Sequence, residues 1–248
     1  MGTSTALPTA TESVPAAPTI NRLIGLGALG GVLAGVASSA VLLALGESSI
    51  SEAIDIESQR PHVGEAHEEM FSRTTQVIGG TVGLVLVGAL LGIVFAVIFA
   101  RTRHRLPGAH DFVRARWLAL AGFMAVIVVP ALKYPANPPA VGDPETVNAR
   151  TLGYVAIIGL SVIAIAVAVR LAPSVRQKVP PALVALAVAL PALALLTVAL
   201  LVLPDAAPAD IPAELLWRFR LASFAGQAAM WSTLALAFGA LVDRPART

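Results

Sequence analysis

The stretch that decides the fold is Thr75–Ala100, TQVIGGTVGLVLVGALLGIVFAVIFA, which holds no Asp, Glu, Lys, Arg or His. A helix needs about 20 such residues to cross the roughly 30 Å hydrocarbon core of a bilayer. The run is apolar on every face, so it does not fit an amphipathic helix of a water-soluble protein, and it is too long for one strand of a membrane barrel. It therefore predicts a transmembrane helix.

Five other stretches share these properties, and together they predict an all-α, polytopic membrane bundle of about six helices. The chain of 248 residues agrees with this class, because 56% of its residues are apolar, 13% are charged and its mean hydropathy is +0.79. We expect a disordered tail over residues 1–21, a bundle over 22–242 and a short tail over 243–248. The six spans are expected at 23–46, 75–100, 117–132, 151–169, 179–203 and 221–242.

The basic residues of the short loops predict the orientation of the bundle. With the N-terminus inside, the inner segments hold 11 of the 17 Lys and Arg residues, whereas 12 of the 15 Asp and Glu residues fall outside. Both tails are therefore expected in the cytoplasm of a cell whose plasma membrane holds the protein.

Small residues and prolines inside the spans predict how the helices pack. Glycines recur four residues apart, which places them on one face of a helix and favours a close helix pair over a glycine-lined path: Gly27, Gly31, Gly35, Gly79, Gly83, Gly88 and Gly92. Pro130 and Pro191 each remove a backbone hydrogen bond, so both should bend their helices.

A short pattern occurs twice, with Arg114-Ala-Arg116 before the third span and Arg218-Phe-Arg220 before the sixth. In both copies, Ala-Gly follows at the same distance from the second arginine, as Ala121-Gly122 and Ala225-Gly226. The two copies would lie on opposite sides of the membrane, as an inverted repeat of three plus three helices requires. Chance similarity in a chain so rich in Ala and Leu is the alternative interpretation.

Several classes of function are disfavoured by what the chain lacks. It has no cysteine, so thiolate metal sites, disulfides and cysteine nucleophiles are excluded. A net charge of +2 offers no patch for nucleic acid. No phosphate-binding loop, no Ser-His-Asp set and no ionisable residue within the spans is present, so we expect neither an enzyme nor a proton-relay pump.

The first outer segment, from Glu47 to Arg73, is the densest group of candidate metal ligands. It carries seven acids and two histidines, and a mixture of carboxylate and imidazole suits Co²⁺, Ni²⁺ or Zn²⁺. A solvated acidic loop is the alternative interpretation. The candidate ligands in this segment are His62, Glu65, His67, Glu68 and Glu69.

The second outer loop, Lys133–Thr146, contains four prolines that stiffen its backbone. Because the span before it has only 16 residues, the loop would dip into the bundle and line a vestibule, with Asn137, Asp143 and Glu145 as candidate ligands. A rigid external cap is the equally weighted alternative.

The same loop carries a family resemblance. The sequence PALKYPANPPAVGDPET at 130–146, followed by Arg150-Thr151 and Tyr154, resembles the hallmark stretch of the CbtA-type cobalt transporter subunit family. LLWRFRLAS at 215–223 and EEMFSR at 68–73 are similar to further segments of that family.

The resemblance implies a bacterial inner-membrane protein that takes up Co²⁺ for cobalamin synthesis together with a small, one-span, histidine-bearing partner subunit. It implies no tightly bound cofactor. Two features depart from the family pattern: only His62 and His67 stand where relatives carry more histidines, and six spans are counted where about five are usual. Alternative functions are a permease for Ni²⁺ or another divalent cation, and a membrane scaffold or metal sensor that transports nothing.

Overall fold

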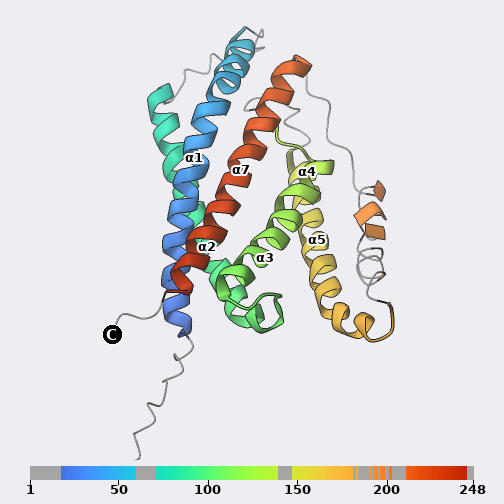
Figure 1. Cartoon of the computed structure of the whole chain (residues 1–248). Helices are drawn as coiled ribbons and strands as arrows, with labels where there is room; N and C mark the ends of the chain where they lie inside the picture. The colour runs from blue at the N-terminus through green and yellow to red at the C-terminus, as the bar shows by residue number, and fades with distance from the viewer. Residues whose placement is uncertain are drawn as a thin grey trace, which may run out of the picture.

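The computed structural model describes residues 18–59, 71–138, 147–180 and 211–244, with a few residues between 183 and 202. This part of the chain is helical and contains no strand, which confirms the all-α prediction (Figure 1). A 3₁₀ turn, η1, and a π-helix, η2, interrupt the α-helices. The elements are α1 (Ile20–Ser58), α2 (Arg73–Thr102), η1 (Arg103–Arg105), α3 (Asp111–Phe123), η2 (Met124–Val128), α4 (Val129–Lys133), α5 (Val147–Arg176) and α7 (Ala213–Val242).

Within the described ranges, five helical segments are long and apolar enough to cross a membrane, with α3, η2 and α4 forming one of them. This confirms a polytopic helical bundle. The predicted span 179–203 lies mostly outside the described residues, as do the tails over 1–17 and 245–248 and the predicted bend at Pro191.

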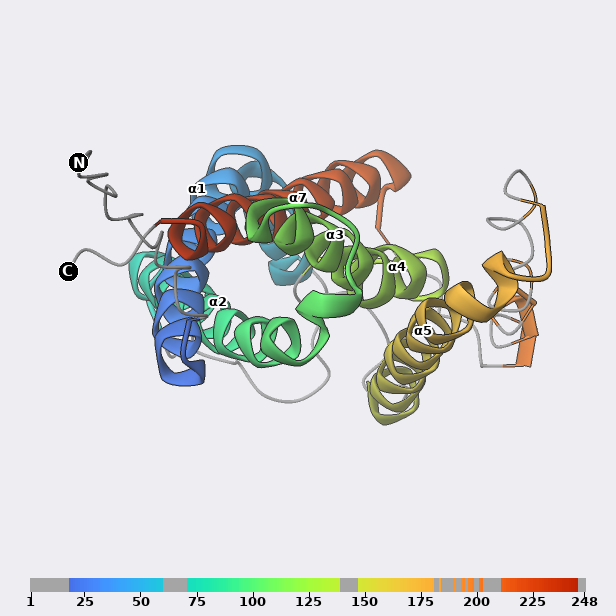
Figure 2. The same ribbon diagram turned by 60° about the horizontal axis from the view of Figure 1, so that its bottom comes forward.

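Helices α1, α2 and α7 form the main body of the bundle, and α3 packs against α7 (Figures 1 and 2). Helix α5 stands to one side and contacts α4 and η2. The start of α1 lies beside the end of α7, where the Arg22 side chain donates a hydrogen bond to the carbonyl oxygen of Arg244 at 3.1 Å. We call this end of the bundle the terminal face and the opposite end the loop face.

The glycines of α1 and α2 bring these two helices into backbone contact. A Cβ added at Gly31 would overlap the carbonyl oxygen of Gly88, and one at Gly35 would lie 2.6 Å from the carbonyl oxygen of Leu84. Gly27 and Gly92 face each other in the same way. The predicted tight helix pair is confirmed for these positions.

The remaining two glycines of the predicted set behave differently. A Cβ at Gly79 or Gly83 would have nothing within 4 Å, so the expectation that they also line the helix pair is wrong. They lie near the loop-face end of α2, where the two helices are not in backbone contact.

The core of the main body is centred on three phenylalanines. The rings of Phe95 and Phe99 in α2 each lie 5.2 Å from the ring of Phe238 in α7, in edge-to-face geometry. Such pairs stabilise by about 0.5–1.5 kcal/mol beyond the apolar area they bury. Together with Leu23 and Leu234, they join α1, α2 and α7 into one cluster.

Two helices extend beyond their predicted spans at the loop face. We expected α1 to end at residue 46, but it continues to Ser58, so residues 47–58 are helix rather than loop. Helix α7 begins at Ala213 rather than 221. The additional turns are held by packing, since Ser49 and Ala53 of α1 and Leu215 of α7 are buried. Hydropathy alone did not predict this extension, because hydropathy identifies only the apolar part of a helix that lies in the hydrocarbon core.

Helix α5 likewise exceeds its predicted span of 151–169, running from Val147 to Arg176. The third span is also longer than the predicted 117–132, because α3, η2 and α4 together cover Asp111–Lys133. At 1.5 Å per residue these 23 residues reach about 34 Å, enough to cross a bilayer. The premise that a short span pulls the following loop inward is therefore wrong.

The π-helix η2 lies just before Pro130 and accommodates the missing backbone hydrogen bond, while the predicted bend itself stays a prediction. Pro130 has no N–H, and the Val129 N–H donates to the carbonyl of Met124, five residues back, instead of that of Ala125. The Ala125 carbonyl is thus left without a partner inside its helix. The hydroxyl of Ser161, completely buried in α5, donates to it.

The two copies of the short arginine pattern lie at opposite ends of the bundle. Arg114 and Arg116 are near the terminal-face end of α3, whereas Arg218 and Arg220 are near the loop-face end of α7 (Figure 1). The inverted repeat requires this placement, but α3 is followed by a π-helix and α7 is continuous. The repeat stays a prediction.

Candidate functional site

A cavity of about 270 Å³, with both polar and apolar side chains in its lining, lies at the loop face between the end of α4 and the first turns of α5. We call it the loop-face basin. Its lining combines side chains from both ends of the proline-rich connection, and all but one belong to the motif that resembles a known family. The lining residues are Tyr134, Pro135, Asn137, Val147, Arg150, Thr151 and Tyr154.

Tyr134 joins the two sides of this basin. Its N–H donates to the carbonyl of Pro130 at 2.8 Å, which ends α4, and its side chain is 8% exposed. The phenol lies against the backbone of Gly153 in α5, so closely that a Cβ at that position would overlap it. With Val129 and Ile157, the ring forms a small core of its own. The motif tyrosine therefore fixes α4 against α5.

Arg220 of α7 holds the next part of the motif. Its Nη2 donates to Oδ1 of Asn137 at 3.2 Å and its Nε donates to the carbonyl of Ala136 at 3.3 Å. The guanidinium also lies 5.9 Å from the centre of the Trp217 ring, within the range of a cation–π interaction. Arg220 thus connects the loop to the main body.

Arg150 brings a second positive charge to the basin. Its Nε is buried and has no hydrogen-bond partner among the described residues. An arginine nitrogen in that position is available to a carboxylate. The described side chains around the cavity are therefore neutral or cationic, and a divalent cation would need additional negative groups there.

Two acids in the last turns of α1, Glu47 and Glu52, form ion pairs with neighbouring helices. Glu47 accepts two hydrogen bonds of 2.8 Å from Nη2 of Arg73 in α2, one to each carboxylate oxygen. Glu52 pairs with Arg218 of α7 at 2.5 Å. Both acids were predicted to lie in an acidic loop, but the structure places them on a helix where they help to join α1 to its neighbours.

A smaller cavity of about 120 Å³ lies between α1 and α2 beside the Glu47–Arg73 pair. Its polar lining includes Ser39, Gln76 and Thr81. The Ser39 hydroxyl already donates to the carbonyl of Gly35 at 2.9 Å, and the Gln76 amide donates to that of Phe71 at 3.2 Å. With these groups satisfied, the larger loop-face basin is the stronger candidate site.

The structure places one of the eight predicted metal ligands, Asn137, and puts it in the basin. The other seven lie outside the described residues: His62, Glu65, His67, Glu68, Glu69, Asp143 and Glu145. Within the described ranges, no three His, Asp or Glu side chains gather as a metal site. The ligand set stays a prediction.

Sequence reasoning did not select Arg150, Thr151, Tyr154 or Arg220 as site residues. The first three were visible as part of the motif, but their shared position beside Tyr134 was not. Arg220 is separated from Asn137 by 83 residues, and only the packing of α7 brings the two together.

These features define a polytopic helical membrane protein with the loop-face basin at one end of its bundle. A family model described as probable cobalt transporter subunit, CbtA, matches residues 20–243, and the chain belongs to this family. The family description is that of a transporter subunit and not of an enzyme. Comparisons with curated proteins and with solved structures give no match.

Proposed function

We propose that this chain is the membrane subunit that carries Co²⁺ across the bacterial plasma membrane to supply cobalamin synthesis. The observation that supports it best is the loop-face basin, in which the motif residues of the family gather around one cavity. The connection 139–146, which joins the two sides of the basin along the chain, carries Asp143 and Glu145. These acids would supply the negative charge that the described lining lacks.

Asn137 would be a weak ligand in this basin. Its Oδ1 already accepts a hydrogen bond from Arg220, so a bound cation would compete with a guanidinium for the same oxygen. Transport needs a site from which the ion leaves easily, and weak binding at several sites meets that need. Arg150 and Arg220 would hold the carboxylates when no metal is present.

Capture from the outer side would use His62, Glu65, His67, Glu68 and Glu69. Mixed carboxylate and imidazole ligands bind Co²⁺ well, but such ligands bind Ni²⁺ more tightly still. Selection of cobalt would therefore depend on geometry and supply more than on ligand type. A permease for Ni²⁺ is the second candidate, favoured by this same ligand chemistry.

The small, one-span, histidine-bearing partner implied by the family resemblance would provide ligands that this chain lacks inside the membrane. Among the described residues, buried hydroxyls in the middle of the bundle include Ser39, which donates to the Gly35 carbonyl, and Ser161, which donates to the Ala125 carbonyl. A hydroxyl and a carbonyl that satisfy each other offer little to a divalent cation, which must lose its water. We therefore expect transport to need both subunits.

Uptake of radioactive cobalt into cells that express this chain, alone and with the partner, tests the proposal. We expect uptake well above background with both chains and competition by excess Ni²⁺. Background uptake in both cases would leave the scaffold or sensor alternative. Stronger uptake of nickel than of cobalt would instead assign the permease to Ni²⁺.

Two sets of variants locate the sites. His62→Ala with His67→Ala should raise the cobalt concentration for half-maximal uptake about tenfold, the effect expected when about 1.4 kcal/mol of binding free energy is lost. Asn137→Ala should lower the maximal rate more than the amount of protein in the membrane. Glu214→Gln changes an exposed charge at the same end of α7 and outside the basin, so it is the control and should leave both values nearly unchanged.

A further inference from the structure

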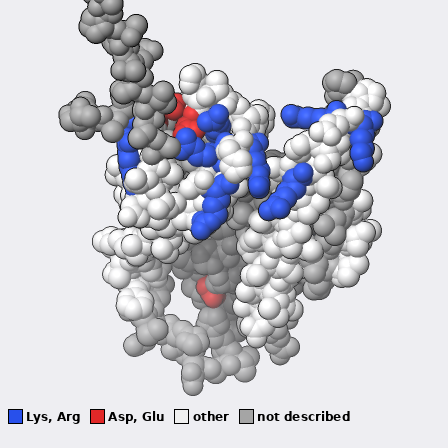
Figure 3. Space-filling model, turned by 90° about the horizontal axis from the view of Figure 1, so that it is seen from below, with Lys and Arg blue, Asp and Glu red and all other residues white. Residues whose placement is uncertain are grey.

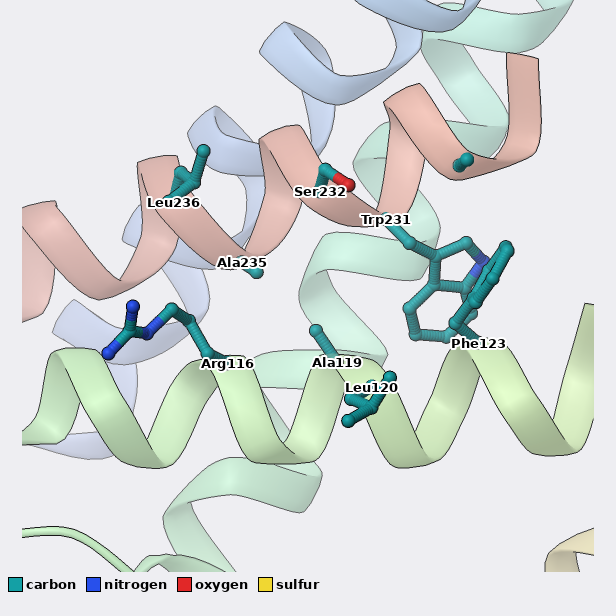
Figure 4. Close-up of a pocket in the computed structure, with 9 residues that line it drawn as sticks. Arg116, Ala119, Leu120, Phe123, Trp231, Ser232, Ala235 and Leu236 are labelled. Carbon is teal, nitrogen blue, oxygen red and sulfur yellow. The ribbon is translucent and has the colours of Figure 1, made fainter. Parts of the chain in front are cut away.

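A third cavity, of about 300 Å³, lies between α3 and α7 and is separate from the loop-face basin (Figure 4). Three alanines face it, Ala119 from α3 and Ala228 and Ala235 from α7. Arg116 lies at one end, while the rings of Phe123 and Trp231 lie together at the other (Figure 4). The volume is at the lower end of the range of about 300–1,000 Å³ that is usual for small-ligand pockets. We call it the α3–α7 groove.

The groove exists because the two helices touch on either side of it. Near the terminal face, Phe112 of α3 packs on Gly239 of α7, where a Cβ would lie 2.8 Å from the phenyl ring. Further along, the Trp231 ring of α7 packs on Gly122 of α3 so closely that a Cβ at that position would overlap the ring. Between these contacts the lining includes the small side chains of Ala119, Ser232 and Ala235, which leave space between the helices.

Arg116 places a positive charge at one end of this apolar space. Its guanidinium lies 4.8 Å from the centre of the Phe112 ring, which orients it. The two described acids nearby are engaged elsewhere. Asp111 pairs with Arg103 at 3.2 Å and Arg114 at 2.8 Å, and Asp243 accepts a hydrogen bond of 3.3 Å from the Phe112 N–H.

We propose that the α3–α7 groove binds an anionic phospholipid, with an acyl chain between the two helices and the headgroup phosphate on Arg116. The groove lies between two membrane-spanning segments, so the lipid is the molecule that surrounds it. An apolar slot with one cation at its end matches an amphiphile with one anionic end. Arginine suits a phosphate because its fork of donors can bind two oxygens at once.

The charge of the terminal face supports an anionic rather than a zwitterionic lipid. Basic side chains spread over this face, with few acidic ones visible among the described residues (Figure 3). A surface of this kind attracts anionic headgroups within about one Debye length, roughly 10 Å at moderate salt. The basic residues near this end of the bundle are Arg22, Arg101, Arg103, Arg105, Arg114, Arg116, Arg170, Arg176, Lys178 and Arg244.

Native mass spectrometry of the purified full chain tests this proposal, which does not depend on the ion that is transported. Phosphatidylglycerol and phosphatidylcholine with the same acyl chains are added in turn, and the bound fraction of each is measured. We expect one phosphatidylglycerol to bind more tightly than phosphatidylcholine. Arg116→Gln should weaken phosphatidylglycerol binding about fivefold, the effect of one basic group at a membrane surface.

Three further variants separate the groove from general surface charge. Arg105→Gln removes the same charge from the same face outside the groove and should weaken binding much less than Arg116→Gln does. Arg116→Lys should keep most of the preference for the anionic lipid. Ser232→Phe adds a ring at an exposed position that lines the groove, and should weaken the binding of both lipids to the same extent.

Equal losses for Arg116→Gln and Arg105→Gln would overturn the proposal, because the charge of the whole face would then attract the lipid. Unchanged lipid binding by Ser232→Phe would also overturn the proposal, because it would show that the acyl chain does not lie in the groove. A wild-type protein that retains a second copy of itself instead of lipid would assign the groove to an interface between copies. Circular dichroism of each variant distinguishes loss of lipid from loss of fold.

Discussion

The two sides of the bundle are built differently. On one side, α1, α2 and α7 meet through glycines and a phenylalanine cluster, and their facing surfaces are closely packed. On the other, among the described helices α5 contacts η2 and α4, through Ser161 and the small core around Tyr134. Exposed apolar side chains such as Leu152, 72% exposed, cover much of the rest of α5.

This difference suggests that one side of the bundle gives the protein its stability and that the other side carries its function. In lipid, helices associate through close packing and hydrogen bonds rather than through the hydrophobic effect, so the glycine contacts make the α1–α2–α7 side a stable support. The α4–α5 side carries the π-helix and the loop-face basin. Single π-turns inside helices occur often at functional sites, where they allow local movement. We therefore expect substitutions on the first side to reduce stability and substitutions on the second to alter transport.

The largest effect is expected where the helix backbones touch. Gly31→Ala introduces a Cβ that overlaps the carbonyl oxygen of Gly88, and we expect a loss of about 2–3 kcal/mol in the free energy of unfolding in detergent. Gly79→Ala adds the same methyl group to α2 in open space, and should change stability by less than about 1 kcal/mol. Similar losses for both variants would show that helix propensity, and not close contact, explains the glycines.

A smaller effect is expected at the π-helix. Ser161→Ala leaves the Ala125 carbonyl without its donor, at an expected cost of about 1–2 kcal/mol. Ser39→Ala is the control, because this equally buried serine donates to the carbonyl of Gly35 in its own helix, which has a backbone partner as well. Thermal unfolding measures both. If Ser39→Ala costs as much as Ser161→Ala, the π-helix does not depend on the contact with α5.

The smallest effect is expected at the loop-face end of α1. Glu52→Gln breaks the partly exposed pair with Arg218, and we expect a loss of at most about 1 kcal/mol that disappears at high salt. Asp55→Asn removes the same charge from an exposed position of the same helix and should have no measurable effect. A loss that persists in 1 M salt would contradict a simple ion pair, because charges in contact with water are screened there.

Much of the fold could be predicted because it depends on local sequence. The absence of charge from Thr75–Ala100 and similar runs is enough to predict helices that cross lipid, and the spacing of Gly27, Gly31 and Gly35 predicted the face that packs on α2. Helix ends were predicted less well. Hydropathy reports where lipid begins, whereas α1 continues to Ser58 because its extra turns pack and pair with neighbouring helices.

The candidate site was predicted only in part, because its residues come from distant positions in the chain. Asn137 was chosen for its amide in a proline-rich loop, and the structure places it in the basin. No periodicity connects it to Arg220, and none connects Glu52 to Arg218, which is 166 residues away. The histidine and acidic ligands of the first outer segment still rest on residue type alone.

The sequence by itself determined that this chain is a helical membrane protein, since the free energy of placing a residue in lipid is a property of that residue and its neighbours. It also determined the cobalt transporter subunit family, because the residues of the motif are read directly from the chain. The tertiary structure alone decided which side chains share a cavity. Tyr134 on Gly153, Arg220 on Asn137 and Arg116 at the end of the α3–α7 groove all depend on how helices cross, and that depends on packing between segments far apart in the chain.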